Sequence, residues 1–174
     1  MRTELRRKER AMKTSREMEL LLERAPVGRL AVTTPDGPYI VAVNYLFFNG
    51  SLYFHSGLAG RKVDALRADP RVCFMVDEIG PQVLWKQGCG ISQVYQSVVC
   101  FGKAEFVEGQ AEKREILEKM VQKYVPTSYP FSPLKDQNVK KTAVIRIAIE
   151  SMSGKENALS PAHTVINNPS PEMG

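Results

Sequence analysis

The stretch that decides the fold of this chain is Tyr53-Phe54-His55-Ser56-Gly57-Leu58-Ala59-Gly60-Arg61-Lys62-Val63-Asp64-Ala65-Leu66. It contains a strand-like run, a turn with two glycines and a helical run that starts with two adjacent cations. At such a junction, free N–H groups, the positive end of the helix dipole and the side chains of Arg61 and Lys62 can converge on one phosphate. The stretch therefore predicts a strand, a turn and a helix that together hold a phosphate-bearing ligand.

The strand at the start of this stretch has two faces, because successive side chains of a strand point to opposite sides. Tyr53 and His55 share one face, and Phe54 and Ser56 share the other. Ser56 is thus expected close to the turn, where its hydroxyl could donate to a phosphate oxygen. His55 could be a ligand contact, a general acid or a core histidine with a satisfied hydrogen bond, and taken alone the last is the commonest case.

The two adjacent cations also admit a simpler interpretation. Arg61 and Lys62 could be the solvated start of a surface helix, paired with Asp64 or Asp69. Spacing alone does not decide between this interpretation and a phosphate site.

The composition fits one domain, since 174 residues with 43% hydrophobic content can bury a single core. No apolar run approaches the roughly 18 residues that span a bilayer, and the N-terminus lacks the apolar segment of a signal peptide. We therefore expect a cytoplasmic protein without a membrane partner. The formal charge of +5 arises in residues 1–16, a short basic arm without aromatic residues, and this arrangement does not favour nucleic-acid binding.

Cysteine and histidine are too sparse to suggest a metal site. Cys73, Cys89 and Cys100 show no CxxC spacing, and His163 is the only histidine besides His55. Cys73 and Cys100 lie in strand-like runs and are expected in the core. Cys89 is expected in a loop, in the glycine-rich segment around Trp85.

The rest of the sequence indicates a β-rich domain. Thr14 and Glu17 form a capping-box pattern at the start of a helix, and Asn49-Gly50 favours a type I′ hairpin turn. Strands are expected at 27–34, 38–48, 51–56, 71–77, 94–107 and 142–150, and helices at 15–25, 61–68 and 112–124. The segment 78–92 is expected as a loop or irregular ribbon. The pattern predicts a mainly β fold with flanking helices, a six-stranded antiparallel barrel, between a basic arm at 1–14 and a tail at 156–174.

Two strands carry further information. The strand at 38–48 is apolar at nearly every position, which suggests burial on both faces, inside a barrel or at a subunit contact. In the strand at 94–107, Gly102 is a plausible bulge or close-approach site.

At the level of motifs, the chain resembles a known superfamily. The segments that carry the resemblance are Phe54 to Lys62, Asp69 to Phe74 and Ser97 to Glu105, with Arg6 to Arg10 and Ala25 to Ala31 upstream. In this order they are similar to the FMN-binding split-barrel superfamily, and more narrowly to its nitroimidazole-resistance (Nim) branch, which is related to pyridoxamine 5′-phosphate oxidase. The similarity covers roughly residues 5–155, so the barrel domain is placed at 15–155.

The resemblance implies a homodimer with FMN in the clefts between subunits. Arg61 and Lys62 match the family's phosphate-binding cations, and His55 and Ser56 match the two residues at the strand end that meet the phosphate and ribityl side. The strand whose backbone follows the flavin ring matches Val41, Ala42, Val43 and Asn44. Ser97 stands where the oxidase has a glutamine and is expected to make a polar contact.

The chain also departs from the oxidase branch. That branch ends in a motif with a tryptophan and paired arginines, whereas the last strand here supplies only Arg146. Pyridoxamine phosphate oxidation is therefore not favoured.

The resemblance implies an FMN-dependent oxidoreductase that takes electrons from NAD(P)H or a protein donor and reduces nitroaromatic or related small acceptors. His55 is the first candidate for a catalytic group, with Tyr45 or Tyr95 in its place. The alternative is a flavin- or haem-binding protein without turnover, a carrier or sensor.

Overall fold

The protein is described by a computed structural model that covers residues 6–84, 91–158 and 164–166. Its helical elements are η1 (Lys8–Arg10), α1 (Ser15–Arg24), α2 (Arg61–Ala68), α3 (Gln110–Tyr124) and α4 (Asp136–Lys140). Its strands are β1 (Gly28–Thr34), β2 (Gly37–Val43), β3 (Tyr45–Phe48), β4 (Ser51–Ser56), β5 (Arg71–Leu84), β6 (Ser92–Phe106), β7 (Ala143–Asn157) and β8 (Thr164–Ile166). Trp85, Cys89 and His163, for which the sequence analysis made predictions, lie outside the described residues.

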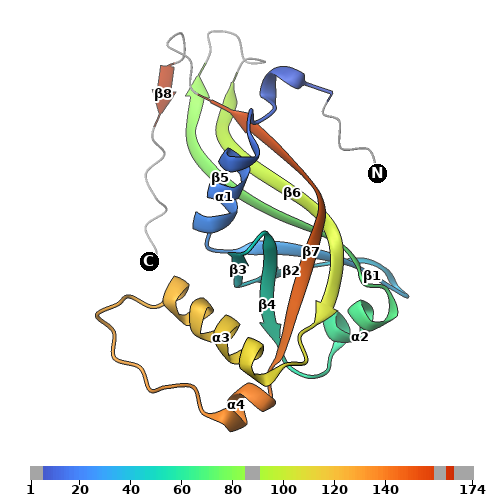
Figure 1. Cartoon of the computed structure of the whole chain (residues 1–174). Helices are drawn as coiled ribbons and strands as arrows, with labels where there is room; N and C mark the ends of the chain where they lie inside the picture. The colour runs from blue at the N-terminus through green and yellow to red at the C-terminus, as the bar shows by residue number, and fades with distance from the viewer. Residues whose placement is uncertain (1–5, 85–90, 159–163, 167–174) are drawn as a thin grey trace, which may run out of the picture.

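The strands form one antiparallel sheet in the order β2-β1-β5-β6-β7-β4-β3, and the short β8 pairs with β5. The sheet curls around the core with α1 on its inner side, while α2, α3 and α4 lie near one end (Figure 1). A mainly β fold with flanking helices is thus confirmed. The expected count of six strands was wrong, because the run at 38–48 breaks at Asn44 into β2 and β3, and because β8 adds a further strand.

The hairpin between β3 and β4 follows the sequence prediction. Asn49 and Gly50 have φ angles of 48° and 69°, and the two positive values fit the Asn-Gly preference of a type I′ turn. The turn sets the register that pairs Phe48 with Ser51 and ends with Tyr45 opposite Phe54.

The central strands are longer than the sequence pattern indicated. β5 continues to Leu84 through a register shift between Ile79 and Gln82, so residues 78–84 form strand rather than the expected loop. Gly80 lies in this irregular part, where a Cβ atom would meet the side chain of Val94. The expected irregularity at Gly102 is confirmed, since the β6–β7 register shifts between Phe101 and Gly102. A Cβ atom there would collide with the backbone carbonyl of Ala148 on β7.

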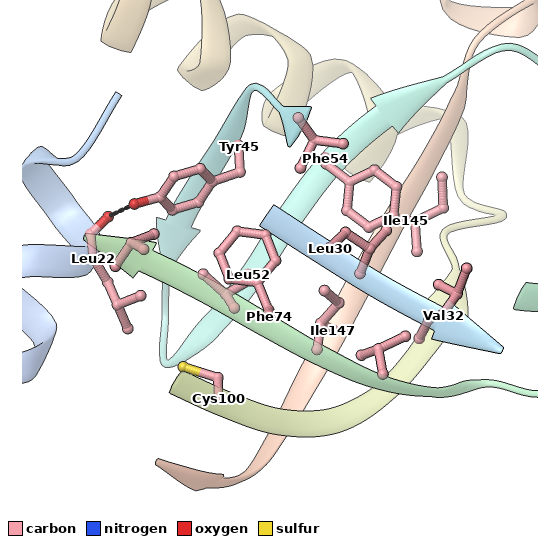
Figure 2. Close-up of a cluster of buried hydrophobic side chains, with 14 of the residues drawn as sticks. Leu22, Leu30, Val32, Tyr45, Leu52, Phe54, Phe74, Cys100, Ile145 and Ile147 are labelled. Carbon is pink, nitrogen blue, oxygen red and sulfur yellow. Dashed lines mark hydrogen bonds between the residues drawn. The ribbon is translucent and has the colours of Figure 1, made fainter. Parts of the chain in front are cut away.

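Helix α1 closes the inner side of the barrel. The capping box is confirmed, because the Thr14 hydroxyl accepts from the Glu17 amide at 3.2 Å and the Glu17 carboxylate accepts from the Thr14 amide at 3.0 Å. Leu21 and Leu22 are completely buried. The Tyr45 hydroxyl donates to the Leu22 carbonyl at 2.6 Å, which ties the helix to β3 (Figure 2).

The strand β4 separates two hydrophobic clusters. Its inward face contributes Leu52 and Phe54 to the main core. Figure 2 shows part of that core, with Leu22, Leu30, Val32, Tyr45, Leu52, Phe54, Phe74, Cys100, Ile145 and Ile147 labelled. The opposite face contributes Tyr53 to a smaller cluster with Val144 and Met120 under α3. The predicted division of this strand into two faces is therefore confirmed for its buried residues.

The segment before α1 is attached to the far end of the sheet. Ala11 forms a β-bridge with Lys155, and the Met12 amide donates to the Gly154 carbonyl at 3.1 Å. Met12 is buried, and a Cβ atom on Gly154 would lie 2.6 Å from its sulfur atom. Within the residues that the structure describes, no helix is both long and apolar enough to cross a membrane.

Candidate functional site

The sheet is split between β2 and the end of β4. Strand β2 pairs only with β1, and the β3–β4 ladder stops at Phe54, so in the described structure one backbone edge of β2 and of His55–Ser56 is free of sheet pairing. On their other side, His55 and Ser56 pair with β7. A single residue, Asn44, connects β2 to β3 although these strands lie at opposite ends of the sheet.

Helix α2 starts at Arg61 with Gly60 as its N-cap. Gly60 has a φ angle of 118°, a conformation that side chains strongly disfavour. The amides of the first helical turn have no partner within the helix, and Arg61 and Lys62 stand in this turn. The sequence prediction of the helix and its bounds is confirmed.

Arg61 lies over the ring of Tyr39, with its guanidinium carbon 4.6 Å from the ring centroid. It donates to the Thr34 hydroxyl at 3.3 Å and lies 3.4 Å from the Asp36 carboxylate. Both members of this ion pair are well exposed, so it adds little stability. Arg61 thus bridges from α2 to the turn between β1 and β2.

Lys62 is half-buried at the open end of the barrel. Its ammonium lies 5.2 Å from the centroid of the Phe54 ring. It makes no ion pair or hydrogen bond with another described residue. Burial lowers the pKa of Lys62 from its ordinary value, since no carboxylate offsets the desolvation of its charge.

The structure contradicts the pairing partners of the simpler interpretation, although Arg61 is exposed to solvent as that interpretation expects. Asp69 is engaged by Arg71, which donates to its carboxylate at 2.7 Å. This interaction lowers the pKa of Asp69 to about 2. Arg61 pairs with Asp36 rather than Asp64, and the phosphate site remains a prediction.

The side chain of His55 lies on the face of β4 opposite Ser56. It lines a pocket between β4 and helices α3 and α4. This pocket has a volume of about 310 Å³. The imidazole is exposed to solvent on one side. Desolvation by the surrounding protein, with a smaller contribution from the charge of Lys62, lowers the pKa of His55 below its ordinary value of 6.5. The ring is therefore mostly neutral at pH 7.

The side chains of β2 alternate between the core and the outer face. Val43 is buried and Val41 packs against the same core, whereas Ala42 and Ile40 are exposed on the outside. Within one chain the strand is thus buried on one face only, and not on both faces as its composition suggested. The outer face is free to contact another molecule.

Ser97 lies on β6, which β1 and β5 separate from β2 in the sheet. The sheet order therefore does not place Ser97 next to the expected flavin strand. Ser97 lies on the outer side of β6, opposite Asp77 in the ladder, and its hydroxyl donates to the Lys155 carbonyl at 3.3 Å. Asp77 in turn forms an ion pair with Arg29. A flavin site that includes both Ser97 and α2 is therefore easier to build with one of them from a second subunit.

Sequence reasoning missed the residues that α4 adds beside His55. Helix α4 brings Asn138 and Val139 to the pocket, and Thr142 follows it. No local pattern indicates these residues, because a five-residue helix has too few positions to show periodicity. The helix at 112–124 was predicted, and its apolar side chains both pack in the smaller cluster and line the pocket.

The fold and the site together define a split-barrel protein with a cationic strand, turn and helix at the opening of its sheet. The sequence model of the pyridoxamine 5′-phosphate oxidase family matches residues 14–156. The chain therefore belongs to this family, and its resemblance to the FMN-binding split-barrel superfamily is confirmed.

Solved structures agree with this assignment. A candidate 5-nitroimidazole antibiotic resistance protein from Bacteroides thetaiotaomicron is 30% identical, with a TM-score of 0.73, and the match covers 84% of this chain and 86% of that one. The flavocytochrome Anf3 from Azotobacter vinelandii has a TM-score of 0.84 at 20% identity, over 98% of this chain and 89% of its own. The FAD and haem binding protein from Mycobacterium smegmatis has a TM-score of 0.81 at 16% identity, over 95% and 91%. The last two show the fold alone.

A curated relative matches over a shorter stretch. An uncharacterized protein of Rhizobium meliloti (strain 1021) is 35% identical over 60 residues. The match spans 34% of this chain and 39% of that protein.

Proposed function

We propose that this protein binds FMN in the split between β2 and the end of β4, acts as a homodimer, and reduces small acceptors such as nitroaromatic compounds. The observation that carries the proposal is the half-buried ammonium of Lys62, which has no anionic partner among the described residues. A phosphate would supply the missing charge. Arg61 and the amides without a helical partner belong to the same first turn of α2 as Lys62, so this turn offers three kinds of anion-binding group to a phosphate.

The donor set at α2 fits the phosphate of a flavin. Ser56 is on the side of β4 that faces the core and α2, and its hydroxyl adds a neutral donor. The hollow on the other side of Arg61 is less suitable for an anion, because Asp36 and Asp64 line it. The phosphate would therefore bind on the side of Lys62.

The ring system would lie along β2. The free backbone edge of Val41 to Asn44 offers N–H and C=O groups at regular spacing, and the strand is apolar, as a planar heterocycle requires. An unpaired strand edge must otherwise be satisfied by water. The ring would thus bind where the sheet has left its hydrogen-bonding groups unused.

A second copy of the chain would cover the outer face of the sheet. Ile40 on β2 and Ile79 on β5 are 66% and 65% exposed. Between them lie half-buried apolar side chains of the same face, among them Met75 and Val99. Exposed apolar area of this extent is typical of an interface. A dimer through this face would also explain how Ser97 could contribute to a flavin site of the partner.

When bound, FMN would supply the redox chemistry, taking electrons from a nicotinamide or protein donor and passing them to the acceptor. The chain would bind the phosphate, position the ring against β2 and exclude water through the partner subunit. His55, at the end of β4, is our candidate for accepting a proton, since its lowered pKa keeps a neutral imidazole available at pH 7.

The visible spectrum of the purified full-length protein tests binding, and identification of the released chromophore tests FMN. The expected result is a flavin spectrum and FMN in the extract, with NAD(P)H consumption that a 5-nitroimidazole stimulates. A protein that binds neither FMN nor another phosphate-bearing flavin would refute the proposal.

The second candidate function is a flavin- or haem-binding protein without turnover. It is favoured by the position of His55 on the wall of an apolar pocket, since imidazole is a common haem ligand. A Soret band in the purified protein, or bound flavin without NAD(P)H consumption, would support it over the reductase.

A further inference from the structure

The pocket between α3, α4 and β4 has the construction of a ligand site. Its inner wall is apolar and comes mainly from α3, with α4 and the preceding loop closing one side. The apolar lining residues are Leu117, Met120, Val121, Tyr124, Val125, Leu134 and Val139. A volume of about 310 Å³ lies at the lower end of the roughly 300–1,000 Å³ range of small-molecule pockets, which suits a ligand of one ring.

The rim of the pocket is polar and largely unpartnered. The side chains of Asn44, His55 and Asn138 make no hydrogen bond to another described residue, and the Thr142 hydroxyl donates to the Asn138 carbonyl at 2.8 Å. Each asparagine amide both donates and accepts, as does a neutral imidazole. These groups can exchange hydrogen bonds with solvent for equivalent hydrogen bonds to a ligand amide.

Among the residues that the structure describes, none with a carboxylate, lysine or arginine side chain lines the pocket. An ionised ligand would therefore lose its hydration without gaining a counter-ion in the pocket, which is costly. A neutral molecule with an aromatic ring for the α3 wall and a group that both donates and accepts for the rim meets each of these conditions.

We infer that the α3–α4 pocket binds a neutral, one-ring aromatic carboxamide, with the ring against Met120 and Val121 and the amide at Asn44, His55 and Asn138. This site lies across β4 from Ser56 and from the phosphate site proposed at α2. Its occupancy does not require the flavin.

Benzamide is the probe, and the readout is the methyl resonance of Met120 in full-length protein labelled with [methyl-13C]methionine. The Met120 signal, assigned with a Met120→Leu variant, is expected to shift in a saturable titration. The signals of Met12 and Met18, which contact Gly154 at the other end of the barrel, are expected to stay constant. A Met120 signal that does not respond to benzamide overturns the inference without any variant.

Two variants of α3 separate filling of the pocket from a general effect on the helix. Val121→Trp fills the cavity and should weaken benzamide binding by about tenfold or more. Glu115→Trp places the same side chain at an exposed position of α3 and should leave the affinity unchanged. Asn138→Ala, which removes one rim amide without added bulk, should weaken binding by about fivefold. Equal affinity in wild type, Val121→Trp and Asn138→Ala would overturn the inference.

Benzoate tests the charge requirement, since it has the same ring and an anionic group. Benzoate is expected to bind at least about tenfold more weakly than benzamide, and equal affinity would overturn the assignment to neutral ligands.

An Arg61→Ala, Lys62→Ala double variant tests whether the pocket is independent of the proposed flavin site. It should lose FMN affinity and retain benzamide binding, whereas parallel loss of both would contradict a separate pocket.

Discussion

Replacement of Lys62 by methionine tests the phosphate site directly. Methionine keeps much of the length and apolar character of the lysine stem, so it can still cover the Phe54 ring, but the ammonium is lost. A hydrogen bond to a charged group contributes about 1.5–3 kcal/mol. Since each 1.4 kcal/mol is tenfold in affinity, FMN should bind roughly 10- to 150-fold more weakly to the variant.

Riboflavin provides the internal control, because it has the same ring and ribityl chain without the phosphate. Its affinity should change little between wild type and Lys62→Met. Titration of flavin fluorescence with both ligands and both proteins gives the four affinities of a thermodynamic cycle. The coupling between Lys62 and the phosphate is the difference between the FMN and riboflavin effects.

Lys119 supplies a matched control on the protein side. Its ammonium lies 4.4 Å from the Phe48 ring centroid, so Lys119→Met also removes a cation from an aromatic face, but away from α2. This variant should bind FMN as wild type does. If Lys62→Met weakened FMN and riboflavin equally, or weakened neither, the assignment of Lys62 to the phosphate would be refuted.

Three further predictions concern the dimer, the histidine and the sheet. Ile40→Asp should raise the dimer dissociation constant at least about tenfold in analytical ultracentrifugation, because the 66% exposed side chain would gain about 1–2 kcal/mol per copy on burial and an aspartate would gain none; an unchanged dimer would show that this face is not the interface. NMR titration should place the pKa of His55 below 6.5 and, in Lys62→Met, closer to that value. Because the folded state then binds fewer protons than the unfolded state, the contribution of His55 to stability falls as the pH drops from 6.5 through its folded pKa, and a pKa above 6.5 would contradict the environment described. Gly102→Ala should lower the free energy of unfolding in urea by about 1–3 kcal/mol or more, because its Cβ would meet a carbonyl of β7, whereas Gly57→Ala, whose Cβ has room, should change it little, and equal effects would contradict the close approach.

The parts of the fold that local chemistry determines could be predicted from the sequence. The capping box at Thr14, the Asn49-Gly50 turn and helix α2 each depend on a few adjacent residues, and all three are present as expected. The irregularity at Gly102 belongs to the same class, since glycine in a strand signals close backbone approach.

The extents of the long strands could not be predicted in this way. β7 runs to Asn157, seven residues beyond the expected end, although the segment after Glu150 has no alternating pattern. It is held as a strand by pairing with β6 along that whole length. Such pairing depends on a partner distant in sequence, and a local pattern contains no information about it. The same reason explains why residues 78–84 were expected as a loop.

The candidate site was predicted in part. Period-two geometry correctly put His55 and Ser56 on opposite faces of β4, yet both were assigned to one ligand from the resemblance. In the structure His55 and Ser56 have different surroundings, because α3 and α4 form a pocket on the His55 side of β4. Only the tertiary fold creates this pocket. Their assignment to the flavin remains a prediction, with Ser56 on the side of α2.

Asn44 is the one residue between β2 and β3, and it belongs both to the free edge of the split and to the rim of the α3–α4 pocket. A rotation of β2 about this residue would alter the width of the split and the shape of the rim together. If such a rotation had different energies with and without each ligand, the two sites would be linked, and any effect of one ligand on the affinity of the other would be reciprocal.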